Sequence, residues 1–149
     1  VMLVAKGNPL EIQSLKDLGN PGLRVGTTDP KASTLGAMSH QLIRETGQFA
    51  AVKENIVMMA DTAHTLVQTM EAGEQLDVAM VYEANVQHLN ERFEFVPLEK
   101  EYAIAVQNVA ARKTTIYQNL ARRLMTRLAS ITSRRRFEQL GFQWEADSK

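Results

Sequence analysis

The sequence of 149 residues contains no cysteine, so disulfides, cysteine nucleophiles and thiolate metal sites are excluded. It has no excess of charge of either sign, because 17 basic side chains balance 17 acidic ones, and the whole chain has no net field that attracts nucleic acid or anionic membrane. No apolar run approaches the roughly 20 residues that a membrane-spanning helix needs. Aromatic residues make up only 6% of the chain, but the apolar fraction of 44% indicates a folded domain with a real core.

Residue patterns typical of enzymes are also missing. The three histidines, His40, His64 and His88, lie far apart in the sequence and show neither metal-ligand spacing nor a nucleophile motif. No glycine-containing loop ends in the Gly-Lys-Ser sequence of a Walker phosphate loop. We therefore predict a protein that is not an enzyme, with no catalytic residues, no metal site and no cofactor.

The chain does contain an alternation of strand and helix patterns. We expect strands at 1–5, 23–28, 55–60, 76–82, 93–98 and 102–108, and helices at 14–18, 33–46, 61–72, 114–129 and 133–140. Strands separated by crossover helices predict an α/β fold with a mainly parallel sheet flanked by helices, followed by a C-terminal helix pair. The expected boundaries are 1–108 for an α/β ligand-binding lobe and 109–149 for the C-terminal helices.

Two loops that lead from a strand into a helix are candidate binding segments. The first, "VGTTDPKASTLG" at 25–36, combines hydroxyl side chains with the free N–H groups of a helix start, where an anion can bind without lysine or arginine. The simpler interpretation is that Ser33 or Thr34 only caps its own helix. In the second loop, Asp61 is a suitable N-cap, and Thr62 is open to the same two interpretations. Tyr82 ends a buried strand, and its hydroxyl points either into a cleft or to solvent.

The segment "RRRFEQLGFQW" and the arginines of the preceding helix pattern raise the possibility of nucleic-acid binding. Phe137, Leu140 and Phe142 fit a packed face instead, and the overall charge is zero. We interpret the arginines as a solvated basic face and predict no nucleic-acid partner.

Several segments together resemble the periplasmic molybdate-binding proteins of ABC transporters, and they follow the same order along the chain. They are "VAKGNP", "SLKDL", "LRVGTTDPKASTLG", "TLVQTMEAGEQLDVAMVY" and "FEQLGF". The resemblance implies a periplasmic-binding-protein-like fold of two α/β lobes that hold an oxyanion between them. It also implies that this chain holds lobe two and the C-terminal helices, which return to lobe one, and that the N-terminal part of lobe one is absent here.

The resemblance also implies ligand-binding residues in lobe two. Backbone N–H groups are expected at Leu35 and Ala63, and a ligand-binding hydroxyl at Tyr82, with Thr34 and Thr62 beside them. Thr34 and Leu35 stand where the family usually has proline and alanine before Gly36. The threonine adds a hydroxyl, and the leucine adds bulk close to the anion.

The function that follows is an extracytoplasmic solute-binding protein, in the periplasm, that captures a tetrahedral oxyanion such as molybdate or tungstate for an ABC importer. Its expected partners are the small oxyanion and the importer's membrane subunits. The alternative is a ligand-sensing domain of the same fold in a transcriptional regulator or signalling protein. We also expect the chain to self-associate, because an apolar stripe at Ile116, Leu120, Leu124 and Leu128 needs a surface to cover it.

Overall fold

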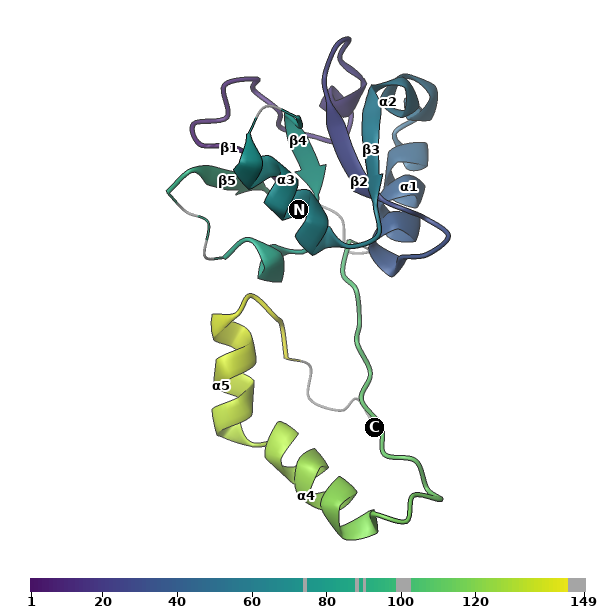
Figure 1. Ribbon diagram of the computed structural model, residues 1–149, viewed down its shortest axis with the longest axis vertical. Coiled ribbons are helices and arrows are strands. Elements are labelled where there is room, and N and C mark those ends of the chain that lie inside the picture. Colours follow the sequence, from purple (N-terminus) through teal and green to yellow (C-terminus); the bar gives the residue numbers. More distant parts are fainter. Residues whose placement is uncertain (74, 88, 90, 99–102, 145–149) are drawn as a thin grey trace. The chain divides into compact units, whose positions relative to one another are not determined.

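The computed structural model of the protein describes residues 1–73, 75–87, 89, 91–98 and 103–144. The chain divides into two compact units, Val1–Ala105 and Val106–Lys149 (Figure 1). The first unit holds a five-stranded sheet with its helices, and the second holds two further helices. Among the described residues, no helix is both long enough and apolar enough to cross a membrane.

The sheet has the strand order β3-β2-β4-β1-β5. The strands are β1 (Met2–Ala5), β2 (Val25–Thr28), β3 (Ile56–Ala60), β4 (Val78–Met80) and β5 (Phe93–Val96). Strand β2 pairs in parallel with both β3 and β4, whereas β1 runs antiparallel to its neighbours β4 and β5. The predicted α/β class is confirmed, and the sheet is mixed because β1 runs against the other strands.

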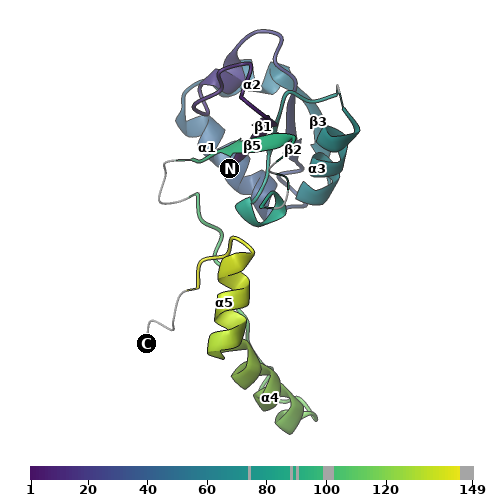
Figure 2. The ribbon, with the colours of Figure 1, turned by 90° about the vertical axis from the view of Figure 1, so that its left-hand side faces the viewer.

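Helices cover both faces of this sheet. Helix α1 (Thr34–Glu45) and helix α2 (Phe49–Asn55) lie on one face, and helix α3 (Ala63–Ala72) lies on the other (Figure 2). The side chains of each strand alternate between the two faces, so two apolar clusters form. One cluster joins Met2, Val25 and Val78 to Ile43 of α1, and the other joins Leu3 and Ala79 to Leu66 of α3, so the sheet is buried on both sides.

Several predicted elements differ from the observed ones. Helix α2 was not predicted, because its seven residues span only two turns and carry a weak apolar pattern. The strand predicted at 102–108 is not observed: residues 103–108 form no strand, although they begin with four apolar residues, and residue 102 lies outside the described residues. The predicted turn at 14–18 is a short 3-10 helix, η1 (Asp17–Gly19).

The second unit contains helix α4 (Gln118–Leu128) and helix α5 (Ile131–Gln139). Helix α4 begins four residues later than predicted, so Ile116 precedes it. The apolar stripe is exposed: 85% of Ile116, 62% of Leu120 and 55% of Leu124 are accessible to solvent. The second unit therefore carries an apolar face that the other described residues of this unit leave exposed.

Charge is distributed unevenly between the two units. Residues 1–105 contain eight basic and fourteen acidic side chains, whereas residues 106–149 contain nine basic and three acidic ones. The net formal charges are therefore −6 and +6. The total of zero describes neither unit.

Candidate functional site

Strands β2, β3 and β4 are parallel neighbours, so their carboxyl ends meet at one edge of the sheet. In open α/β sheets this is the edge at which ligands bind, because the loops there lead into helix N-termini. A hollow of about 340 Å³ lies at this edge. Its lining residues are Ala32, Ser33, Leu35, Asp61, Thr62, Ala63, His64, Tyr82 and Asn85.

The start of helix α1 forms one side of the hollow. Ser33 is the N-cap, and its Oγ accepts hydrogen bonds from the Gly36 N–H at 3.4 Å and from the Thr28 hydroxyl at 3.1 Å. These two bonds occupy both acceptor positions of the Ser33 hydroxyl, so its own proton is left to donate. No described residue accepts a hydrogen bond from the Leu35 N–H, which belongs to the unpaired first turn of the helix.

Gly36 brings this helix start close to the end of β2. A Cβ atom placed on Gly36 would lie 2.4 Å from the Thr28 carbonyl oxygen and 2.6 Å from that of Asp29. Only glycine permits this approach without a shift of the backbone. The position of the α1 N-terminus relative to the sheet edge therefore depends on glycine at position 36, which has no Cβ atom.

The start of helix α3 forms a second side of the hollow. Thr62 is its N-cap, with Oγ1 accepting from the Thr65 N–H at 3.2 Å. The expectation that Asp61 caps this helix was wrong, because the helix starts one residue later than that expectation required. The Ala63 N–H opens the helix, and no described residue accepts a hydrogen bond from it.

Tyr82 and Asn85 follow strand β4 and complete the lining. Burial raises the pKa of the Tyr82 phenol, so its hydroxyl remains a neutral donor at physiological pH. The backbone N–H of Tyr82 donates to Asn85 Oδ1 at 3.2 Å. Because this bond fixes the amide oxygen of Asn85 against the backbone, its NH₂ group is the part left to donate to a ligand.

Four of the five predicted binding residues line the hollow: Leu35, Thr62, Ala63 and Tyr82. The fifth, Thr34, opens helix α1 between two lining residues but is not itself one of them; Ser33 lines the hollow beside it. Sequence reasoning missed Asn85, three residues after Tyr82. The spacing of three residues from Tyr82 indicates a site residue only when the Asn85 side chain is known to accept from the Tyr82 backbone N–H.

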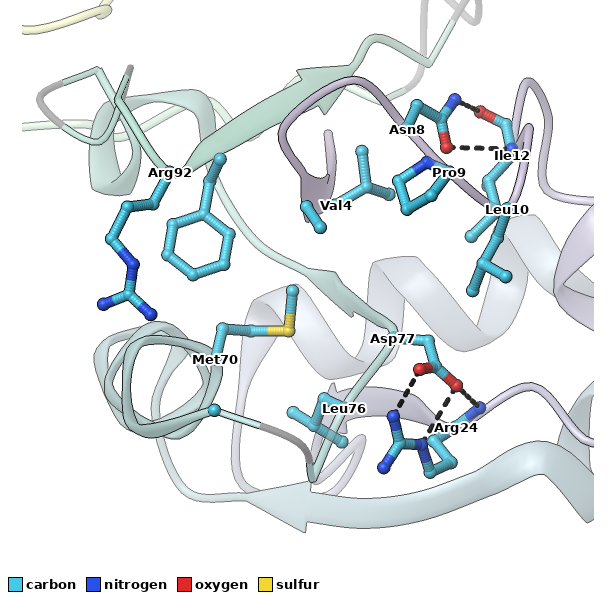
Figure 3. Close-up of a pocket in the computed structure, with 13 residues that line it drawn as sticks. Val4, Asn8, Pro9, Leu10, Ile12, Arg24, Met70, Leu76, Asp77 and Arg92 are labelled. Carbon is cyan, nitrogen blue, oxygen red and sulfur yellow. Dashed lines mark hydrogen bonds and ion pairs between the residues drawn. The ribbon is translucent and has the colours of Figure 1, made fainter.

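A second hollow, of about 300 Å³, lies at the opposite edge of the sheet (Figure 3). It is lined by the starts of β2 and β4, where Asp77 accepts from the backbone N–H of Arg24 at 2.8 Å and from its Nη2 at 2.5 Å. The hydrogen bonds that the Arg24 side chain donates from Nε and Nη2 lower the pKa of Asp77. Apolar side chains such as Met70, Leu76 and Val4 also line this hollow (Figure 3). None of the predicted binding residues lines this hollow.

A model of a family described as bacterial extracellular solute-binding protein matches residues 1–143. The chain belongs to this family. The family's description agrees with two predictions, that of a solute-binding protein and that of a location outside the cytoplasm. No curated protein sequence matches the chain significantly.

Solved structures of PEB3 share the fold of this solute-binding protein. PEB3 with bound L-phospholactate superposes with a TM-score of 0.72, and PEB3 from Campylobacter jejuni with a TM-score of 0.69. Both are 18% identical in sequence, and each alignment covers 97% of this chain and 64% of the PEB3 chain. The chain thus spans about two thirds of the length of these structural neighbours.

Proposed function

We propose that the chain is lobe two of an extracellular solute-binding protein, and that its hollow takes the oxyanion group of a small solute. The observation that carries the proposal is the convergence of neutral donors from three separate segments. The Ser33 hydroxyl and Leu35 N–H come from α1, the Ala63 N–H from α3, and the Tyr82 hydroxyl from the end of β4. Donors held in this way bind an anion by charge-assisted hydrogen bonds.

Helix dipoles strengthen these donors. Helices α1 and α3 both begin at the hollow, and each N-terminus carries roughly half a positive charge. Among the residues that the structure describes, no lysine or arginine lines the hollow, so the dipoles and hydrogen-bond donors supply the attraction for an anion. Such a site binds and releases its ligand without breaking a bond, as a transport protein requires.

The proposal also concerns which oxyanion the hollow binds. Molybdate and tungstate follow from the resemblance in sequence. A phosphate group is a further tetrahedral oxyanion, and one PEB3 structure contains L-phospholactate. Leu35 stands where the molybdate-binding pattern has a smaller residue, which favours a ligand that contacts apolar atoms as well as donors.

The remaining parts of the proposal concern partners and domains. We assign 1–108 to the ligand-binding lobe and 109–149 to helices that return to lobe one. Closure of two lobes around the ligand would give an ABC importer in the membrane a distinct shape to bind, as in hinge-closing binding proteins. The location in this scheme is the periplasm or its extracytoplasmic equivalent.

Replacement of Tyr82 by phenylalanine tests the site in the full-length protein. Loss of a hydrogen bond to a charged ligand costs about 1.5–3 kcal/mol, so Tyr82→Phe is expected to weaken oxyanion binding by roughly 10- to 150-fold. Isothermal titration with phosphate, molybdate, tungstate and sulfate measures this change. The matched control is Tyr117→Phe, because Tyr117 is 65% exposed and lies in the second unit.

The same panel tests the proposal as a whole. A ligand present at 100 times its dissociation constant raises the free energy of unfolding by about 2.7 kcal/mol, which a thermal melt detects readily. If none of these anions stabilises the wild-type protein, the oxyanion function is wrong. Equal affinities of wild type and Tyr82→Phe for these anions would show that the Tyr82 hydroxyl does not bind the anion.

A further inference from the structure

Helices α1 and α2 meet at a cluster of three side chains, His40, Arg44 and Phe49, which we call the α1–α2 junction. His40 and Arg44 lie one turn apart on α1, and Phe49 is the first residue of α2. The His40 imidazole contacts the Phe49 ring edge-on, with the ring centroids 5.8 Å apart and the planes inclined at 62°. The guanidinium carbon of Arg44 lies 4.2 Å from the centroid of the same ring. Phe49 also packs against the apolar cluster that contains Ile43, so the junction links both helices to the core.

The Nε2 atom of His40 is buried at this junction without a hydrogen-bond partner. Solvent does not reach the atom, and no described residue forms a hydrogen bond with it. A neutral imidazole fits this position when its proton is on Nδ1, because Nε2 then carries only a lone pair. A protonated imidazole has an N–H at both nitrogens, so its Nε2 proton would point to a place without an acceptor. Burial of a charged group without a partner is costly, and the folded chain therefore favours the neutral ring.

Two charged groups act on the His40 ring in addition to its burial. Burial has the largest effect and lowers the pKa of His40, and the Arg44 guanidinium on the same helix lowers this pKa further. The Asp29 carboxylate, in the loop between β2 and α1, acts in the opposite direction without cancelling the other two effects. At the contact itself, α2 contributes the uncharged ring of Phe49. The His40 ring is therefore harder to protonate in the folded chain than in the unfolded one.

We propose that the α1–α2 junction is a pH-sensitive contact, which loosens helix α1 from helix α2 when His40 takes up a proton. The stability that the neutral ring contributes is fully present above the unfolded pKa of about 6.5, and it is lost as the pH falls toward the lower pKa of the folded state. A protein outside the cytoplasm meets the pH of its surroundings, so mildly acidic surroundings would loosen this contact. The inference concerns the chain without ligand and does not depend on the proposed oxyanion function.

Amide hydrogen exchange of the full-length protein without ligand tests the proposal, after correction for the intrinsic pH dependence of exchange. As the pH falls from about 7.5 to about 5, protection of α1 and α2 is expected to fall relative to that of α3. The fall is up to about tenfold for each unit by which the folded pKa of His40 lies below the unfolded one. His40→Phe keeps an aromatic ring against Phe49 and removes the titrating group, so this fall is expected to disappear. His64→Phe is the matched control, because His64 is exposed on α3, and the fall in α1 and α2 is expected to persist.

A titration of the histidine rings by NMR in the wild-type protein is the second measurement, and it does not require a folded variant. The His40 ring is expected to titrate below the value of about 6.5 that a free imidazole shows. Titration at or above that value overturns the proposal. So does a loss of protection that His40→Phe retains, that His64→Phe abolishes, or that affects α3 as strongly as α1 and α2. Because no ligand is present in either measurement, these results leave the proposed function unaffected.

Discussion

Replacing Gly36 by alanine is expected to destabilise the first unit and displace the start of helix α1. The added methyl group would lie 2.4 Å from the Thr28 carbonyl oxygen and 2.6 Å from that of Asp29, where ordinary contact begins at 3.4 Å. The methyl therefore requires a shift of about 1 Å between the helix and the end of β2. The backbone here resists movement, because the Asp29 N–H donates to Ala60 O at 3.0 Å and Asp29 O accepts from the Ser33 N–H at 2.9 Å.

The magnitude follows from two opposing effects. Overpacking that forces a backbone shift costs about 1–3 kcal/mol. Alanine is a better helix former than glycine, which returns about 0.5–1 kcal/mol. The net loss lies between about 0 and 2.5 kcal/mol, with a central value of about 1 kcal/mol. In a domain of this size each kcal/mol lowers the melting temperature by roughly 4–8 °C. We expect anion affinity to fall as well, because the shift moves the Leu35 N–H and the Ser33 hydroxyl away from the hollow.

Thermal unfolding followed by circular dichroism measures the change, and Gly19→Ala is the matched control. A methyl on Gly19 would lie 2.6 Å from Gln48 Oε1, a nominal clash of similar depth, but that atom ends a flexible side chain that can rotate away. Gly36→Ala should therefore melt well below Gly19→Ala. If Gly36→Ala melts at or above the wild-type temperature, helix propensity outweighs the clash and the argument from close approach is wrong.

Two further predictions concern an ion pair and an exposed face. Arg24 lowers the pKa of Asp77 in the folded state, so this pair stabilises the fold above pH about 4 and is lost as the pH falls through the folded pKa. Because the Arg24 side chain is 44% exposed, Asp77→Asn should lower the free energy of unfolding in urea by only about 1 kcal/mol at neutral pH. The difference between wild type and variant should vanish in strong acid. A difference that stays constant at all pH values would contradict this pH dependence. Leu120 and Leu124 are more than half exposed, so the double variant Leu120→Asp, Leu124→Asp should lower the sedimentation coefficient of a self-associating chain to that of a monomer. A monomeric wild type would contradict the predicted self-association.

Much of the fold was predictable because it depends on local signals. Ser33 and Thr62 cap helices α1 and α3. Helix α1 was predicted from its capping hydroxyls and α3 from Asp61 as the expected cap, each followed by an apolar stripe. The antiparallel direction of β1 was not predictable, because strand direction depends on which distant strand it pairs with, here β4 and β5. Residues 103–108 show that a short apolar run alone does not make a strand.

The candidate site was predictable to the extent that it lies at the ends of elements. The resemblance to molybdate-binding proteins implied Leu35, Ala63 and Tyr82. These residues lie after a strand or at a helix start, and the structure brings them to one hollow. Asn85 was not identifiable from the sequence, because its side chain is oriented by a hydrogen bond from the Tyr82 N–H to its Oδ1, which only the structure shows. Asp61 was likewise missed as a lining residue, since its sequence position suggested a helix cap.

The division of charge between the two units has a practical consequence for handling the protein. With a sequence isoelectric point of about 7.0, the chain would be expected to pass through ion-exchange columns of either type at neutral pH. Its halves carry −6 and +6, so it behaves as a large zwitterion. At ionic strengths where the Debye length reaches about 30 Å, each half interacts with a resin of the opposite sign. Retention on both an anion and a cation exchanger, abolished on both by moderate salt, is the behaviour that this distribution implies.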